Sequence, residues 1–273
     1  MRTFGLIGKS LSHSLSQQYF TNKFHQHNIN DAEYCLFSLT KIEEIRELFK
    51  HPTLHGFNVT IPYKTEVIPY LDELDAVAQE VGAVNCVVKQ NDKWIGYNTD
   101  VIGFERLLQK LEVQEFKSSR VQEFKVQGSK NSYGLTVLRS YGLVLGSGGA
   151  SKAVCYVLKQ RQIPFQIVSR KKTNNTITYN EAAELITNHY TLIINTTPLG
   201  MYPRTDELPP IPYSALTGEH ILIDLIYNPE ETLFLKEGKK QGALTVNGVT
   251  MFEAQAEETY FKFKSSRVKE LKR

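Results

Sequence analysis

The sequence predicts an α/β protein of two domains. Short apolar strand candidates alternate with amphipathic helix candidates in two separate series, and a glycine-rich turn begins the second series. The length of 273 residues suits one or two domains, and a composition with 41% hydrophobic and 11% aromatic residues is sufficient for packed cores. Each series is therefore expected to form a parallel or mostly parallel sheet.

The first series occupies the first hundred residues. Strands are expected at 3–7, 33–38, 56–60 and 83–89, and helices at 16–27, 41–49, 77–80 and 101–111. The last of these helices has apolar residues three and four positions apart, which places them on one face. Asp100 precedes it and is expected to be its N-cap.

The second series follows the same pattern. Strands are expected at 141–145, 165–169, 191–195, 221–226 and 243–246, with helices at 151–160, 180–187 and 232–241. A helical run at 251–263 closes the chain.

The segment 113–140 does not fit either series. Its peptide Phe-Lys-Ser-Ser-Arg-Val, at 116–121, is repeated at 263–268, and its apolar content is low. We expect an inserted surface loop, and a partner-docking peptide is the alternative.

Composition argues against several classes of protein. The basic excess is concentrated in 113–140 and 262–273, and the remainder of the chain is net negative, which disfavours nucleic-acid binding. No stretch is long and apolar enough to span a bilayer. Cys35, Cys86 and Cys155 are widely separated and the histidines lack zinc spacing, so no metal site is expected and a reducing cytoplasm is favoured.

The turn at 145–151 reads Leu-Gly-Ser-Gly-Gly-Ala-Ser and follows an apolar strand candidate. Gly146 allows a tight turn, and Gly148 lets the backbone approach a pyrophosphate at the start of a helix. Ser151 replaces the third glycine of the usual fingerprint. The pattern predicts a dinucleotide site.

The end of the second strand in this series indicates which dinucleotide. An NAD site usually has an acidic residue there to bind the ribose hydroxyls, but this chain has Arg170, Lys171 and Lys172. Cationic groups suit a 2′-phosphate, so NADP is favoured over NAD.

Four polar segments in the first series are candidates for substrate contacts. Ser14 and Ser16 flank one residue and would point the same way in an extended chain, although a plain N-cap is the alternative. Lys64 follows a strand that ends in Thr60, and the alternative is a surface lysine. Two further segments, containing Asn85 and Asn98-Thr99-Asp100, place amide and carboxylate groups at element boundaries.

In combination these segments resemble shikimate dehydrogenases, of the shikimate/quinate dehydrogenase family. The resemblance covers nearly the whole chain, and its motifs occur in family order: Ser14-Leu15-Ser16, Asn58-Val59-Thr60-Ile61-Pro62-Tyr63-Lys64, Gly82-Ala83-Val84-Asn85, Asn98-Thr99-Asp100, the turn at 146–151, Asn195-Thr196-Thr197-Pro198, Asp224-Leu225-Ile226-Tyr227-Asn228-Pro229, Gly248 and 251–255.

The resemblance implies reversible reduction of 3-dehydroshikimate by NADPH, in the pathway to chorismate and the aromatic amino acids. It assigns catalysis to Lys64 and Asp100. It assigns substrate binding to Ser14, Ser16, Thr60, Asn85, Tyr227 and Gln255, and cofactor binding to Gly146, Ser147, Gly148, Gly149, Ala150, Ser151, Arg170, Thr196, Leu225 and Gly248.

The resemblance also implies two domains with different ligands. A substrate domain is expected at 1–100 plus 249–273, with the last helix returning to it, and a Rossmann-like NADP-binding domain at 101–248. The expected protein is a cytoplasmic monomer or homodimer. The alternatives are a quinate/shikimate dehydrogenase that uses NAD, and a non-catalytic nucleotide-binding regulatory module.

Overall fold

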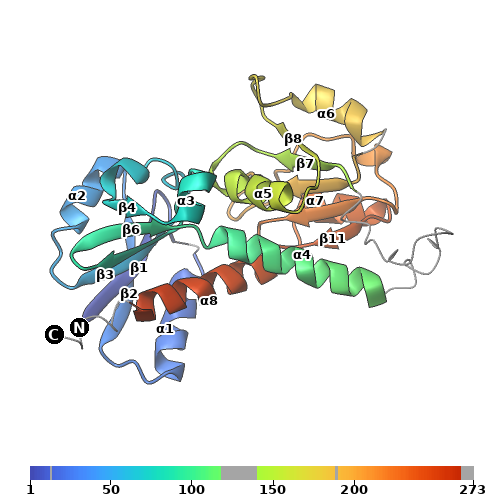
Figure 1. Ribbon diagram of the computed structural model, residues 1–273. Coiled ribbons are helices and arrows are strands. Elements are labelled where there is room, and N and C mark those ends of the chain that lie inside the picture. The colour runs from blue at the N-terminus through green and yellow to red at the C-terminus, as the bar shows by residue number, and fades with distance from the viewer. Residues whose placement is uncertain (13, 118–139, 188–189, 266–273) are drawn as a thin grey trace, which may run out of the picture. The chain divides into compact units, whose positions relative to one another are not determined.

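The computed structural model describes residues 1–12, 14–117, 140–187 and 190–265 (Figure 1). Its contacts divide the chain into two compact units: unit 1 is Met1–Ile102 with the chain from Glu253 onward, and unit 2 is Gly103–Phe252. Each unit is an α/β structure around its own sheet, which confirms the predicted fold class. Most of the predicted insertion, at 118–139, lies outside the described residues.

Unit 1 contains a six-stranded sheet of order β2-β1-β3-β5-β6-β4. Its strands are β1 (Arg2–Gly8), β2 (Ala32–Ser38), β3 (Leu54–Val59), β4 (Glu73–Leu74), β5 (Cys86–Gln90) and β6 (Lys93–Tyr97). β1 is parallel to β2 and β3, whereas β5 is antiparallel to β3 and β6.

The hairpin between β5 and β6 was not predicted from the sequence. Asn91 and Asp92 form its two-residue turn, and both have positive φ, at 51° and 59°. Asparagine and aspartate tolerate this conformation better than most residues, so the turn forms without glycine. Strand β5 begins at Cys86, three residues later than expected, because Gly82 ends the preceding helix in the left-handed conformation.

Helices cover both faces of this sheet. They are α1 (Ser16–Gln26), α2 (Ile45–Leu48), α3 (Ala76–Val81) and α8 (Val249–Ser265), with 3-10 turns at Ile42–Glu44 and Ile68–Tyr70. Figure 1 shows α8 beside α1, and aromatic contacts of Phe20 and Phe4 with Phe263 join the end of α8 to this part of the core. Residues of α2 pack with Phe57 and Trp94 in a second cluster. β1 is buried almost throughout because both faces are covered.

Unit 2 contains a five-stranded sheet of order β11-β10-β9-β7-β8, in which every pairing is parallel. Its strands are β7 (Gly142–Leu145), β8 (Phe165–Val168), β9 (Leu192–Asn195), β10 (Ile221–Asp224) and β11 (Leu244–Val246), and its helices α5 (Gly149–Gln160), α6 (Tyr179–Ile186) and α7 (Leu233–Lys240). From β7 the chain passes to β8 on one side and later to β9 on the other. In doubly wound sheets, ligands bind outside the carboxyl ends of the strands at this reversal point.

Helix α4 (Asp100–Lys117) is longer than expected and crosses the boundary between the units along the chain. Within unit 2 it is joined to the end of α5 by Arg161, whose Nε and Nη2 donate to Glu105 at 2.9 and 2.5 Å. Arg161 also bonds Glu112, and the Arg161 bond lowers the pKa of Glu105. Among the described helices, none has the length and apolar character needed to cross a bilayer.

Candidate active site

Lys64 and Asp100 form a close ion pair in unit 1. Lys64 follows β3 beyond the cis Ile61–Pro62 peptide, and Asp100 is the first residue of α4. Lys64 Nζ lies 2.5 Å from Asp100 Oδ2, and the two side chains are only 14% and 6% exposed. A pair so poorly accessible to solvent interacts more strongly than a surface ion pair does. The alternative interpretation, that Lys64 is a surface lysine, is therefore wrong.

The expectation that Asp100 is the N-cap of α4 is also wrong. The N–H of Val101 donates to Asn98 Oδ1 at 3.3 Å, so Asn98 provides the side-chain cap. The carboxylate of Asp100 points elsewhere: Oδ2 accepts from Lys64 and Oδ1 accepts from Asn85.

Asn85 connects the ion pair to two other segments. Its Nδ2 donates to Asp100 Oδ1 at 2.9 Å, to Thr99 Oγ1 at 2.9 Å and to Gln255 Oε1 of α8 at 3.4 Å. Its Oδ1 accepts from the Thr99 N–H at 2.6 Å. Hydrogen bonds thus bring together four residues that the sequence assigned to catalysis or substrate binding: Lys64, Asn85, Asp100 and Gln255.

A buried polar network that the sequence did not predict lies against this group. Asn58 Nδ2 donates to the Asn85 carbonyl and to Thr259 Oγ1, both at 3.2 Å, and Asn58 Oδ1 accepts from the Tyr34 hydroxyl at 2.8 Å. Thr259 lies 3.1 Å from Thr99 between the hydroxyl oxygens. In the sequence, the one indication of this network was Asn58, a polar residue between the apolar residues Phe57 and Val59 of a strand.

Ser14, Ser16 and Thr60 also belong to unit 1, but the geometry expected for the serines is wrong. Leu15 is in the right-handed helical region, with φ −77° and ψ −7°, so the chain from Ser14 to Ser16 is not extended. Ser14 Oγ accepts from the Ser16 N–H at 3.2 Å. Thr60 follows β3, and its methyl group would be 2.5 Å from a Cβ added at Gly8, so the end of β1 requires glycine.

The glycine turn of unit 2 lies at the carboxyl end of β7, where the strand order reverses. Gly146 has φ +108°, and a Cβ there would be 2.8 Å from Thr196 Oγ1. That hydroxyl donates to the Leu145 carbonyl at 2.8 Å, which holds the start of the β9 loop against the turn. Both backbone conformation and space therefore require glycine at 146.

Beyond the turn, the residues leave open space in front of a helix N-terminus. Ser147 and Gly148 are exposed, and a Cβ at Gly148 would meet no atom within 4 Å. Helix α5 begins at Gly149, and the first N–H groups of any helix lack intrahelical acceptors. Ser151 is buried, and its hydroxyl donates to the Gly148 carbonyl at 2.6 Å, which fixes the turn. These features fit a dinucleotide pyrophosphate.

The three basic residues after β8 differ in their surroundings. Lys172 pairs with Glu181, and this bond is the main cause that lowers the pKa of Glu181 to about 2. Glu181 also completes a capping box with Thr178 at the start of α6. Arg170 and Lys171 are exposed, and no acidic partner is found for either among the described residues. Arg170 is therefore more available to an anion than Lys172.

The remaining predicted residues of unit 2 lie after β10 and β11. Gly248 is required by space, since a Cβ there would be 2.1 Å from the Leu225 carbonyl oxygen. The Tyr227 ring packs on Phe252 with 4.5 Å between ring centroids. Tyr227 belongs to unit 2 and its expected substrate contact stays a prediction.

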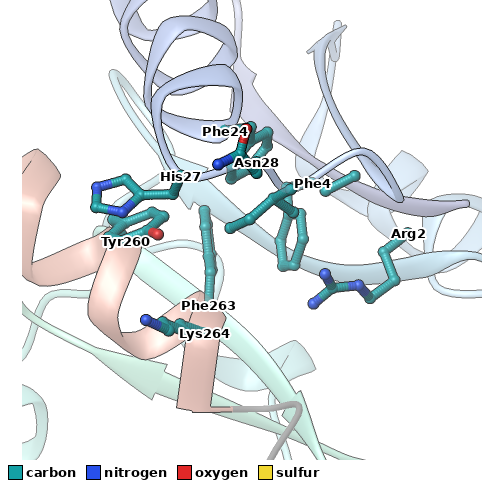
Figure 2. Close-up of a pocket in the computed structure, with 10 residues that line it drawn as sticks. Arg2, Phe4, Phe24, His27, Asn28, Tyr260, Phe263 and Lys264 are labelled. Atoms are coloured by element: carbon teal, nitrogen blue, oxygen red, sulfur yellow. The ribbon is translucent and has the colours of Figure 1, made fainter.

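A hollow of about 290 Å³ elsewhere in unit 1 contains none of these residues. Figure 2 shows the aromatic side chains of Phe4, Phe24, Tyr260 and Phe263 around it. Within the described part of the chain the Tyr260 hydroxyl has no hydrogen-bond partner, but it is buried, so a ligand in the hollow would not reach it. We assign no role to this hollow.

Comparison with known proteins identifies the family. The sequence-family model of the shikimate dehydrogenase substrate binding domain matches residues 6–87. The shikimate dehydrogenase (NADP(+)) of Clostridium beijerinckii is 36% identical over 94% of this chain and 89% of its own length.

Solved structures agree with the sequence comparison. Shikimate dehydrogenase 1 of Peptoclostridium difficile has a TM-score of 0.78 at 32% identity, covering 98% of this chain and 93% of its own. A shikimate dehydrogenase in complex with NADP+ has a TM-score of 0.75 at 31% identity, covering 98% and 90%. The chain belongs to the shikimate dehydrogenase family.

Proposed function

We propose that this protein catalyses the reversible NADPH-dependent reduction of 3-dehydroshikimate to shikimate, a step toward chorismate and the aromatic amino acids. The observation that best supports this reaction is the Lys64–Asp100 pair in its hydrogen-bonded group with Asn85. NADPH, when bound, supplies the hydride that reduces the ketone carbon. The protein then has to stabilise and protonate the ketone oxygen.

Lys64 is the group proposed for that task. As the carbonyl carbon is reduced, negative charge develops on its oxygen, and an ammonium beside it stabilises the charge and donates the proton. Asp100 holds Lys64 Nζ at 2.5 Å, which limits the positions that the flexible lysine side chain adopts. In the oxidation of shikimate the same lysine, deprotonated, accepts the hydroxyl proton.

We assign the other polar residues of unit 1 to substrate binding. Ser14 and Ser16 are proposed to donate to the substrate carboxylate, and Thr60, Asn85 and Gln255 to contact the ring substituents. Tyr227 of unit 2 completes the set. Asn85 and Gln255 already bond each other beside Asp100, so a ring hydroxyl would replace or share existing hydrogen bonds there.

We assign cofactor binding to unit 2. The turn of Gly146, Ser147, Gly148, Gly149, Ala150 and Ser151 is proposed to bind the pyrophosphate, and Arg170 the 2′-phosphate. Thr196, Leu225 and Gly248 are proposed to line the path to the nicotinamide end. The open space at Gly148 before α5 supports this assignment, as does exposed Arg170, which has no acidic partner in the part of the chain that the structure describes.

A spectrophotometric assay tests the proposal. Purified protein with shikimate and NADP+ should produce reduced nicotinamide, and NAD+ and quinate should each be much poorer. Equal or higher rates with quinate and NAD+ would indicate a quinate/shikimate dehydrogenase instead. Absence of turnover with every pair, in protein that binds NADP+, would indicate a non-catalytic nucleotide-binding module.

The cellular setting is part of the same proposal. We propose a cytoplasmic location, since the three cysteines Cys35, Cys86 and Cys155 are free. The protein is proposed to act as a monomer or homodimer, which sedimentation of the purified chain would distinguish.

A further inference from the structure

Asp224 is a fully buried acid in unit 2 to which neither the resemblance nor the proposed reaction assigns a role. It ends β10 and is 0% exposed. Within the described residues no basic side chain pairs with it, and its oxygens accept only from neutral groups. Burying an acid without a cationic partner costs free energy, and hydrogen bonds to the acid have to offset that cost. The partners of Asp224 therefore indicate what the acid does in the fold.

The carboxylate accepts hydrogen bonds from three segments of the chain. Oδ1 accepts from the Ile226 N–H at 3.0 Å and from Asn195 Nδ2 at 3.1 Å. Oδ2 accepts from Thr232 Oγ1 at 2.6 Å. Asn195 ends β9 and pairs directly with Asp224 in the sheet register, while Thr232 is the N-cap of α7.

These bonds extend to the residues proposed to contact the cofactor. Asn195 Oδ1 accepts from both the N–H and the hydroxyl of Thr197, at 3.0 and 2.6 Å, and so fixes the loop that begins at Thr196. The bond from Ile226 turns the chain immediately after Leu225, whose carbonyl is packed against Gly248. The loops after β9 and β10 therefore depend on one carboxylate.

We propose that Asp224 is a positioning residue of the cofactor site, which acts through Asn195, Thr232 and the Ile226 amide to hold the Thr196 and Leu225 loops in their binding conformation. The inference rests on the proposed function, because it takes Thr196, Leu225 and Gly248 as the cofactor-contacting residues. A hydrophobic or neutral residue could fill the same space at the end of β10. Only a group with two acceptor oxygens satisfies all three donors together.

The ionisation of Asp224 provides a way to test this role. If Asp224 only filled space, its titration would not change the affinity for NADP+. Burial raises the pKa of Asp224 to about 7, against the opposing effect of the three donors. Tyr213 is a neighbouring titratable group: burial and then the charge of Asp224 raise its pKa, so it stays neutral over this range. A proton on Asp224 would remove one acceptor position and weaken the hold on the loops.

The test compares Asp224→Asn with Asp206→Asn by titration with NADP+ over a range of pH around neutrality. Asp206 is exposed in the same unit, so its substitution changes the charge equally without touching the network. We expect Asp224→Asn to weaken NADP+ binding about tenfold at alkaline pH and to flatten its pH dependence, with the KM for shikimate unchanged. Asp206→Asn should match the wild type.

The outcomes separate the two proposals. Failure of the wild type to bind NADP+ would refute the proposed function. If the wild type binds NADP+ and Asp224→Asn has the same affinity and the same pH profile, only the positioning role of Asp224 is refuted and the proposed function stands. If Asp224→Asn does not fold, Thr232→Ala removes one of the three donors and leaves the acid. It should weaken NADP+ binding in the same direction by a smaller factor, and unchanged binding would overturn the proposal.

Discussion

In unit 1 the candidate site consists of side chains that bond one another, whereas in unit 2 it consists mainly of main chain made accessible by glycine. Lys64, Asp100, Asn85 and Gln255 belong to one hydrogen-bonded group. At the turn of Gly146 and Gly148, by contrast, the main chain before α5 is accessible, because no atom lies within 4 Å of a Cβ added at Gly148. Substitutions in unit 1 should therefore alter chemistry, and substitutions in unit 2 should alter cofactor binding.

The largest expected effect is that of Lys64→Ala on turnover. Loss of the proton donor should lower kcat by roughly 10²–10⁴-fold, while NADP+ affinity stays near the wild-type value. Steady-state kinetics and NADP+ titration measure the two quantities. Lys93→Ala is the matched control, because Lys93 forms a comparable 2.5 Å ion pair with Glu73 that is exposed. Near-normal turnover in Lys64→Ala would remove this lysine from the mechanism.

Two glycine variants test whether the turn of unit 2 binds the cofactor through its main chain. Gly146→Ala should destabilise the protein by about 1–3 kcal/mol, because alanine is strained at φ +108° and its Cβ meets Thr196. Gly148→Ala should leave thermal stability unchanged, since its Cβ meets nothing within 4 Å. If pyrophosphate binds there, Gly148→Ala should still weaken NADP+ binding about tenfold. Unchanged binding in that variant would place the phosphates elsewhere.

An effect of similar size on cofactor binding is expected from the basic residues after β8. Arg170→Ala should raise the KM for NADPH about tenfold or more and leave the KM for NADH unchanged, since only NADPH has the 2′-phosphate. Lys172→Ala is the control, because Lys172 already pairs with Glu181 at the surface. Kinetics with both cofactors give the selectivity. A larger shift in Lys172→Ala than in Arg170→Ala would reverse the assignment.

The last expected effect is on the pH dependence of stability rather than on activity. The pKa of Asp224 is about 7 in the folded protein and ordinarily 3.8, so between these values the native state retains a proton that the unfolded state has lost. Stability from this group therefore falls as pH rises from about 4 to 7, by up to a few kcal/mol. In thermal unfolding, Asp224→Asn should gain stability relative to the wild type over this range. A constant difference between the two proteins would show that Asp224 does not titrate there.

Much of the fold and several site residues were predictable from local sequence. The apolar strands and the glycine turn of unit 2 were predicted closely, because parallel strands buried on both faces form continuous apolar runs. The β5–β6 hairpin was missed because its Asn-Asp turn is a weaker signal than Asn-Gly. The bonding of Asp100 was also misjudged, since Asn98 and Asp100 are both suitable caps and only the geometry distinguishes them.

By itself the sequence determined the α/β class, the glycine turn and the ordered motifs that identify the family. These depend on periodicity and on residue types at short spacing, both of which are local properties. The tertiary structure decided which side chains meet: Asn85 with Gln255, Asn58 with Thr259, and Asp224 with Thr232. Such partners are far apart in the chain, and their contact depends on how helices and strands pack, which no local pattern encodes.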